Sequence, residues 1–214
     1  MDKRYTDREK RKIVKDNYNA IARAYDERYG DIDGYIRYIN DFLIDLDGGR
    51  VVELGCGSGA LSNYMSECGF SVVALDFSRA LLDIAKRRYP HIDFFEADIA
   101  EYLPSIKYDG LITKDVLFHL PPRDLERVIK NFKNILKKGG RFCIILDIPK
   151  ATGEQLLVEE LDDRFKVYYN YMSVEYIKEL LIKHGFKLDE VNIYDEGDIS
   201  IYATGVMVIH GVNK

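Results

Sequence analysis

Three alternate glycines, Gly55, Gly57 and Gly59, lie between an apolar run at Val51–Leu54 and the start of a helical pattern. Glycines at such a turn let a ligand approach the backbone where side chains would collide, and they aim the amides of a helix N-terminus at it. Asp76 ends the next apolar run, about 20 residues further on, where a carboxylate can accept hydrogen bonds from two ribose hydroxyls. This spacing predicts a site for a cofactor that contains a nucleoside.

The glycine spacing alone leaves the type of cofactor open. Gly55, Gly57 and Ala60 also satisfy the dinucleotide pattern of glycine, glycine, then glycine or alanine. Asp76 would serve a dinucleotide and an adenosyl cofactor equally, because both contain a ribose. A turn with a purely structural role is a third interpretation. The carboxylates of Asp76 and Asp98, each at the end of a later predicted strand, argue against it.

Two further polar side chains, Asp115 and His119, follow the fourth predicted strand. Either could take a proton from a bound substrate, since carboxylate and imidazole groups serve as general bases. His119 could instead hydrogen-bond a nearby loop in a structural role, and both roles stay open. The remaining histidines, His91, His184 and His210, do not pair at metal-ligand spacing, so no metal is expected.

Short apolar runs alternate with helical patterns along the middle of the chain, and this alternation predicts a parallel sheet. The runs, each a predicted strand, lie at 51–54, 72–75, 92–95, 110–113 and 142–146. Two helices precede them: a capping box at Thr6–Glu9 begins the first, which ends at Gly30, and the second runs from Ile36 to Leu46. The runs at 187–194 and 200–210 predict an antiparallel hairpin at one edge of the sheet.

Two more helices are expected, one from Pro121-Pro122 to Gly139-Gly140 and one from Ser173 to Gly185. The segment between them, 147–172, is the least regular part of the chain and suggests an insertion or lid. Its tyrosines are either ordinary packing or the lining of a substrate pocket; they are Tyr168, Tyr169 and Tyr171.

Several motifs together resemble those of the class I S-adenosylmethionine-dependent methyltransferases. They are Glu53-Leu54-Gly55-Cys56-Gly57-Ser58-Gly59, then Leu75-Asp76-Phe77-Ser78, then Glu96-Ala97-Asp98-Ile99. The resemblance extends over nearly the whole chain, to the N-terminal cover at 18–26, the fourth strand at 108–112, the entry to the fifth strand at 136–140 and the late helix at 173–186. Tyr18 and Tyr25 lie in that cover segment, and they are either core residues or part of a lid over the cofactor.

The resemblance implies an α/β fold: a Rossmann-like seven-stranded methyltransferase sheet, mostly parallel with an antiparallel last strand, and two N-terminal cover helices. It also implies a single methyltransferase domain over residues 1–214. Within that domain we expect an N-terminal helical cover at 1–49, a cofactor-binding core at 50–146, a lid-like insertion at 147–172, and a C-terminal helix with edge strands at 173–214.

The cofactor implied by the resemblance is S-adenosylmethionine, with S-adenosylhomocysteine as its product. Gly55 and Gly57 would face the methionine part, and Glu53 would help to hold its ammonium group. Asp76 would bind the ribose hydroxyls. The other contacts implied in this loop and the next turn are Cys56, Gly59 and Ser78.

The adenine and sulfonium ends are assigned in the same way. Phe77 would lie against the adenine ring, and Asp98 with the backbone of Ile99 would read its edge. Lys114 would lie near the sulfonium. Because two cations repel each other, we expect the backbone of Lys114 to make that contact and not its ammonium group.

The function implied is methyl transfer to a small-molecule acceptor by in-line displacement. The sulfonium supplies the leaving group, so the protein mainly positions both partners, excludes water and, for some acceptors, removes a proton. The Asn/Asp-Pro-Pro-aromatic motif of nucleic-acid amino-methyltransferases is replaced here by Thr113-Lys114-Asp115-Val116. A protein acceptor stays open. Two other functions also stay open: a non-catalytic S-adenosylmethionine-binding sensor or partner subunit, and a dinucleotide-dependent oxidoreductase.

Composition narrows the class of protein. A length of 214 residues suits one hydrophobic core, and an apolar content of 47% excludes a disordered chain. The net charge of −5 argues against nucleic acid as a partner. Three cysteines without paired metal spacing suit a reducing cytoplasm, and no run approaches the roughly 18 apolar residues of a membrane span. We therefore expect a soluble, unprocessed, cytoplasmic protein, whose oligomeric state stays open.

Overall fold

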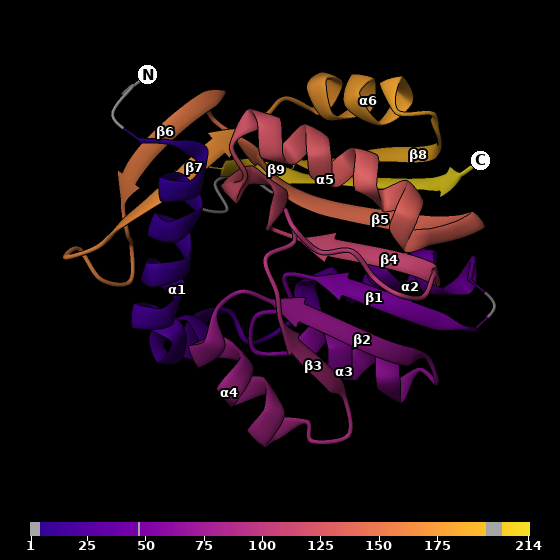
Figure 1. The fold of residues 1–214 in the computed structure, drawn as a ribbon, viewed down its shortest axis with the longest axis horizontal. Helices are drawn as coiled ribbons and strands as arrows, with labels where there is room; N and C mark the ends of the chain where they lie inside the picture. Colours follow the sequence, from indigo (N-terminus) through magenta and orange to yellow (C-terminus); the bar gives the residue numbers. More distant parts are fainter. Residues whose placement is uncertain (1–4, 47, 196–202) are drawn as a thin grey trace.

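The computed structural model describes residues 5–46, 48–195 and 203–214. Within these ranges the centre is a seven-stranded sheet with the strand order β3-β2-β1-β4-β5-β9-β8 (Figure 1). Its strands are β1 (Arg50–Leu54), β2 (Ser71–Asp76), β3 (Asp93–Glu96), β4 (Tyr108–Lys114), β5 (Leu136–Pro149), β8 (Phe186–Asp195) and β9 (Ala203–Asn213). Strands β1 to β5 pair in parallel, whereas β9 is antiparallel to β5 and β8. The expected mostly parallel α/β sheet with an antiparallel last strand is confirmed.

Helices cover both faces of this sheet (Figure 1). One face carries α2 (Ile36–Ile44), α3 (Ala60–Glu67) and α4 (Arg79–Arg88), and the other carries α5 (Pro122–Ile135) and α6 (Val174–Lys183). Each helix turns its apolar side toward the strands, because residues three and four apart share a face. Met65 and Leu82 are buried on the first side and Phe132 on the second. Burial of these side chains away from water holds the layers together.

Helix α1 (Asp7–Tyr29) lies at the arrowhead ends of the parallel strands (Figure 1). The expected capping box begins it: the Thr6 hydroxyl accepts from the Glu9 amide at 3.3 Å, and the Thr6 amide donates to the Glu9 carboxylate at 2.7 Å. On its apolar side, Val14 packs with Val167 and Tyr168. Helix α1 therefore covers the edge of the sheet at which parallel folds bind ligands.

The segment Asp147–Met172, expected to be irregular, is regular in the structure. Strand β5 continues to Pro149, and β6 (Gly153–Val158) pairs antiparallel with β7 (Lys166–Tyr171) in a second, two-stranded sheet. An isolated two-stranded hairpin is only marginally stable in water. Packing against α1 supports this one, and such a long-range contact leaves no periodic signal in the hairpin's own sequence.

The helix expected to end at Gly139-Gly140 ends at Ile135 instead. Leu136 is extended, with φ −88° and ψ 144°, and it pairs with Tyr108 as the first residue of β5. The Asn213 side chain donates to the Leu136 carbonyl at 3.3 Å, which gives that group a partner outside the helix. Helix α2 likewise ends two residues before the expected Leu46. The start of the last strand, expected at 200, falls outside the described residues, and the division of the chain at 49, 146 and 172 stays a prediction.

Candidate functional site

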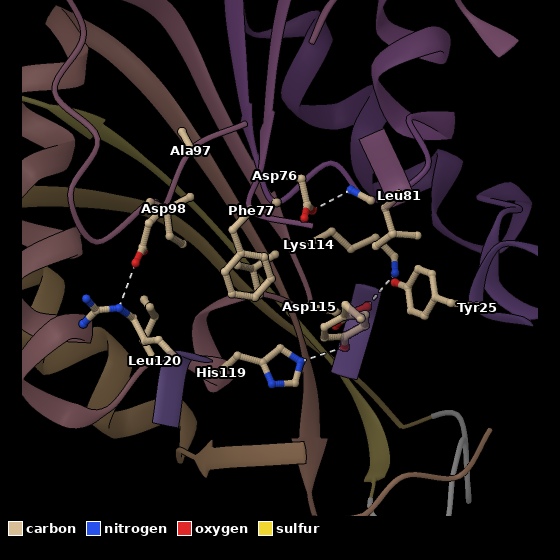
Figure 2. Close-up of a pocket in the computed structure, with 16 residues that line it drawn as sticks. Tyr25, Asp76, Phe77, Leu81, Ala97, Asp98, Lys114, Asp115, His119 and Leu120 are labelled. Carbon is tan, nitrogen blue, oxygen red and sulfur yellow. Dashed lines mark hydrogen bonds and ion pairs between the residues drawn. The ribbon is translucent and has the colours of Figure 1, made fainter. Parts of the chain in front are cut away.

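A pocket lies beneath α1 at the carboxyl ends of β1, β2 and β4 (Figure 2). The empty space among its lining residues, counted together with the part open to solvent, is about 620 Å³. The strand order reverses between β1 and β4, and open parallel sheets bind ligands at such a point. Eleven of the residues predicted from the sequence line it: Tyr18, Tyr25, Gly55, Gly57, Asp76, Phe77, Asp98, Ile99, Lys114, Asp115 and His119.

The glycine turn after β1 is held by the end of β2. Gly55 and Gly57 have positive φ values of 80° and 54°, which residues other than glycine rarely adopt. The Gly57 amide donates to Asp76 Oδ2 at 2.9 Å, and the Ser78 amide donates to Asp76 Oδ1 at 2.8 Å. Burial raises the pKa of Asp76, although these amides oppose the shift. Each carboxylate oxygen keeps a further lone pair that a ligand hydroxyl can use.

Four of the predicted cofactor residues do not line the pocket, and two of them lie beside the glycine turn. Glu53 is buried and accepts a hydrogen bond from the Ser62 hydroxyl of α3. Burial raises its pKa to about 8, so its carboxyl group is mostly protonated at neutral pH. Cys56 is also buried, and burial raises the pKa of its thiol.

The other two residues outside the lining are Gly59 and Ser78, and both serve helix starts. Gly59 precedes α3 with φ 88°, and a Cβ there would lie 2.8 Å from the Phe94 ring. The Ser78 hydroxyl accepts from the Leu81 amide at 3.3 Å, which caps α4, and it donates to Asn19 of α1 at 3.0 Å. Close packing of the turn explains the third glycine of the motif.

Phe77 and Asp98 lie at one end of the pocket, after β2 and β3 (Figure 2). Asp98 Oδ1 accepts from the Ala100 amide at 2.9 Å, and Oδ2 accepts from the Arg11 guanidinium at 2.8 Å. Ile99 adds an apolar wall that is itself buried. This end therefore offers flat apolar surface beside a carboxylate whose orientation is set by two donors.

Lys114 and Asp115, at the end of β4, form a partly buried ion pair. The Lys114 ammonium lies 2.5 Å from Asp115 Oδ2 and 4.0 Å from the centre of the Tyr35 ring. Burial opposes the charge on Lys114, but the Asp115 carboxylate together with Tyr35 and Tyr25 outweighs it, and the pKa of Lys114 is raised. Asp115 has φ 54°, a strained value for a residue other than glycine. Its Oδ1 is buried and has no hydrogen-bond partner among the described residues.

His119 joins α1 to the second sheet. Its Nδ1 lies 2.9 Å from the Tyr168 carbonyl oxygen, which can only accept, so Nδ1 carries the proton. Its Nε2 then accepts from the Tyr18 hydroxyl at 2.8 Å. Burial lowers the pKa of His119 to about 4, so the ring is neutral at physiological pH. Both roles considered for His119 have a basis here, since it bonds a strand and also lines the pocket.

Tyr25 follows Tyr18 on α1 and lies over the glycine turn. Its ring meets Tyr18 edge to face at 5.3 Å, and a Cβ on Gly57 would lie 3.6 Å from it. Burial raises its pKa to about 12. The two tyrosines thus form part of the pocket wall as well as part of the packing of α1.

Sequence reasoning missed five lining residues: Arg11, Leu81, Ala97, Val116 and Leu120. Ala97 and Val116 adjoin predicted residues, so proximity along the chain could have found them. Arg11 gave no signal, because an arginine on a charged N-terminal helix usually lies in solvent. Here its side chain is only 11% exposed.

Within the described residues, no group of three or more metal-ligating side chains could hold a metal ion. The same ranges contain no helix with the length and apolar character needed to cross a membrane. His184 lies 3.3 Å from Glu126 near the end of α6, and His210 is buried in β9, so neither belongs to the pocket.

Comparison with known proteins finds similarity to methyltransferases. A family model described as a methyltransferase domain matches residues 51–140. An uncharacterized methyltransferase from Anoxybacillus flavithermus is 24% identical over 182 residues, which cover 79% of this chain and 84% of that protein. The ubiquinone biosynthesis O-methyltransferase of Coxiella burnetii is 29% identical over 154 residues, and this match covers 69% of the chain but only 58% of the relative.

Solved structures share the fold at low sequence identity. The 1,6-didemethyltoxoflavin-N1-methyltransferase of Burkholderia thailandensis, solved with S-adenosylhomocysteine, superposes with a TM-score of 0.78 at 16% identity, covering 98% of this chain and 91% of that one. Magnesium protoporphyrin IX methyltransferase from Synechocystis gives 0.70 at 19% identity, covering 96% and 97%. The family model over residues 51–140 and these relatives show similarity to methyltransferases, and the sheet order and the solved structures show that the chain has their fold.

Proposed function

We propose that this protein transfers the methyl group of S-adenosylmethionine to a small-molecule acceptor held under α1. One observation carries the proposal: a single pocket is lined both by the glycine turn, Asp76 and Asp98 and by Asp115 and His119. The first set suits a nucleoside cofactor, and the second offers polar groups to a second ligand. A pocket that only bound the cofactor would not need the second set.

The chain's groups fit the cofactor at several points. Gly55 and Gly57 leave room for close backbone approach, and Asp76 keeps lone pairs for ribose hydroxyls. Phe77 and Ile99 would hold the adenine ring, with Asp98 at its edge. Lys114 is tied to Asp115, which supports a contact through its backbone near the sulfonium. When bound, S-adenosylmethionine supplies a methyl group on a sulfonium that is already a good leaving group.

Glu53, Cys56, Gly59 and Ser78 would act indirectly. Glu53 and Ser78 hold the starts of α3 and α4, and these helix starts border the glycine turn and the turn after β2. We assign them support of the cofactor loops, with no direct contact.

The acceptor end has one group suited to accept a proton and one suited to hold a hydroxyl. Asp115 Oδ1 is a buried acceptor without a partner among the described residues, so an O–H or N–H of the acceptor would satisfy it. His119 Nε2 already accepts a hydrogen bond from the Tyr18 hydroxyl. We therefore assign proton acceptance to Asp115, and orientation of Tyr18 and the acceptor to His119.

A small acceptor suits the way the pocket is closed. Helix α1 crosses it and is tied on both sides, by Arg88 to Asp26 at 2.6 Å and by the Asn17 side chain to Glu159 at 2.7 Å. A protein or nucleic-acid chain would have to displace that helix to reach Asp115. The net charge of −5 also disfavours nucleic acid. Buried free thiols at Cys56 and Cys143 suit a cytoplasmic location.

The test combines binding with turnover. Calorimetry should show binding of S-adenosylhomocysteine and negligible binding of NAD, and radiolabelled S-adenosylmethionine should label a compound in a metabolite extract. A preference for NAD would favour the oxidoreductase alternative and contradict the proposal. Tight binding of the cofactor without labelling of any fraction would favour the non-catalytic sensor.

A further inference from the structure

Arg11 contacts three carboxylates, two in the segment after β3 and one in α5. Its Nε donates to Asp98 Oδ2 at 2.8 Å, one terminal nitrogen donates to Glu101 at 3.1 Å, and the other donates to Asp124 in the first turn of α5. A guanidinium can do this because its donors fan out in one plane, whereas an ammonium is a single point of charge. Burial opposes the charge on Arg11, but Asp98 and Asp124 outweigh it and raise its pKa.

Arg11 also stands between two cavities. It lines the pocket under α1 together with Phe77 and Asp98, and the same three residues line a second groove between the start of α1 and the segment after β3. The side chain is 11% exposed, and its partner Asp98 is 29% exposed. Arg11 is therefore part of the wall that separates this end of the pocket from solvent.

The contact with Arg11 leaves Asp98 able to bind a ligand. A carboxylate offers about four acceptor positions. Two are used here, Oδ1 by the Ala100 amide at 2.9 Å and Oδ2 by Arg11 at 2.8 Å, the contact drawn on Asp98 in Figure 2. The two donors fix the plane of the carboxylate, and one position on each oxygen remains.

We infer that Arg11 is a positioning residue for the cofactor: it orients Asp98 to accept from the exocyclic amino group of adenine, and it closes α1 over that end of the pocket. The inference rests on the proposed function, because it requires Asp98 to face adenine. Arg11 would act through Asp98 and would touch no reacting atom.

A purely structural role for Arg11 predicts a different effect on ligand affinities. An ion pair that only fastened α1 would affect every ligand of the pocket equally. Orientation of Asp98 affects only ligands that donate at the adenine edge. In S-inosylhomocysteine a carbonyl oxygen replaces the adenine amino group and the neighbouring N1 carries a proton, so at the position of the amino group it presents an acceptor to Asp98 and that hydrogen bond is lost.

The experiment measures the affinities of S-adenosylhomocysteine and S-inosylhomocysteine for the full chain by calorimetry. The wild type should prefer the adenosyl compound by roughly tenfold or more, the usual effect of a hydrogen bond to a charged group. Arg11→Ala should reduce this preference to within about threefold, mainly by weakening the adenosyl compound. Arg11→Lys keeps a positive charge among the three carboxylates but loses the fan of donors, and it should show the same reduction if Arg11→Ala does not fold.

Lys15→Met is the matched control. Lys15 lies one turn along α1 and binds Glu96 at the end of β3 at 2.8 Å, so its removal breaks a neighbouring tie of the same helix without touching Asp98. Its preference for the adenosyl compound should equal that of the wild type.

Each outcome decides the matter. An unchanged preference in Arg11→Lys, or an equal loss of affinity for both compounds, would overturn the inference, as would a wild type that binds both compounds equally. A wild type that binds neither compound would instead contradict the proposed function itself.

Discussion

The Tyr18 hydroxyl donates a hydrogen bond to His119 Nε2 across 2.8 Å, although 101 positions separate the two residues in the chain. Their rings meet nearly edge to face, at 5.3 Å and 78°. His119 has no freedom to turn away, since its Nδ1 is bonded to the Tyr168 carbonyl at 2.9 Å. One imidazole thus links α1, the loop after β4 and the second sheet around the acceptor end of the pocket.

Tyr18→Phe should therefore weaken the attachment of α1 to the loop after β4 and, through His119, to the second sheet. The change leaves His119 Nε2 buried without its donor, which should lower the free energy of unfolding by about 1–3 kcal/mol. Denaturant titration measures this loss. Tyr29→Phe is a suitable control, because Tyr29 lies on the same helix and is exposed. A Tyr18→Phe protein as stable as the control would mean that the bond contributes nothing to holding α1.

Asp115→Asn should lower the rate of methyl transfer by roughly 10²–10⁴-fold once an acceptor is known, if the carboxylate accepts the proton. His119→Ala should have a smaller effect, because the Nε2 of His119 is already bonded to the Tyr18 hydroxyl. Affinity for S-adenosylhomocysteine should stay nearly unchanged in both variants. Lys114→Met breaks the Lys114–Asp115 ion pair but keeps the carboxylate, so it separates loss of the ion pair from loss of the proton acceptor. Rates within about threefold of wild type for both Asp115→Asn and His119→Ala would mean that positioning alone carries the reaction.

Asp76→Asn should weaken cofactor binding by roughly tenfold or more, because the ribose loses hydrogen bonds to a charged acceptor. The variant keeps the shape of the side chain, but its NH2 group cannot accept from the Gly57 or Ser78 amide that it faces, so one of these bonds is lost as well. Calorimetry with S-adenosylhomocysteine measures the change, and Asp83→Asn on the exposed side of α4 serves as the control. Equal affinities in the two variants would remove Asp76 from the site.

Gly55→Ala and Gly69→Ala form a matched pair. Both positions have positive φ, 80° and 92°, so the backbone strain added by alanine is similar. A Cβ on Gly55 would lie 2.2 Å from Val116, whereas a Cβ on Gly69 would meet no atom within 4 Å. Only Gly55→Ala should shift the pocket wall, so it should lose cofactor affinity and more thermal stability than Gly69→Ala. Equal melting temperatures and affinities would contradict this account of the turn.

The buried carboxyl group of Glu53 should make the free energy of unfolding depend on pH. Its pKa rises from 4.5 to about 8 on folding, so its contribution is complete below pH 4.5 and is lost as pH rises toward 8. Between pH 7 and 8 the unfolding free energy should fall by about 1 kcal/mol per pH unit. Glu53→Gln should remove this slope. His119, whose pKa is lowered from 6.5 to about 4, costs stability only as pH falls below about 6.5, outside the window measured.

The exposed Glu67→Gln variant of α3 is the control for that measurement. It should keep the wild-type slope between pH 7 and 8 in denaturant titrations. If Glu53→Gln keeps that slope as well, burial does not hold the carboxyl group protonated.

Local signals in the sequence predicted the sheet and the cofactor end of the pocket. Alternating apolar runs and helices imply a parallel sheet, and the carboxyl ends of its strands meet at one edge. Gly55, Asp76 and Asp98 each follow such a run, so their convergence follows from topology alone. The bounds of β1 and β2 differ from the predicted ones by at most one residue at each end.

Local sequence signals could not predict the helix end at Ile135 or the second sheet. Leu136 leaves the helix because Tyr108 and Asn213 supply partners for it, and both lie far from it in the chain. Strands β6 and β7 are stable because they pack on α1. Periodicity within a segment reports only which of its own residues share a face.

By itself, then, the sequence determined the fold class and the residues that meet at the carboxyl ends of the strands, because both depend on short-range patterns and on topology. For α1 the sequence left Tyr18 and Tyr25 as either core or lid residues and gave no signal for Arg11, so their place in the pocket wall depends on tertiary packing. Arg11 meets Asp98 across 87 positions, and Tyr18 meets His119 across 101. Such pairs depend on how one helix packs across the sheet edge, and side-chain spacing along that helix is equally compatible with full exposure to water.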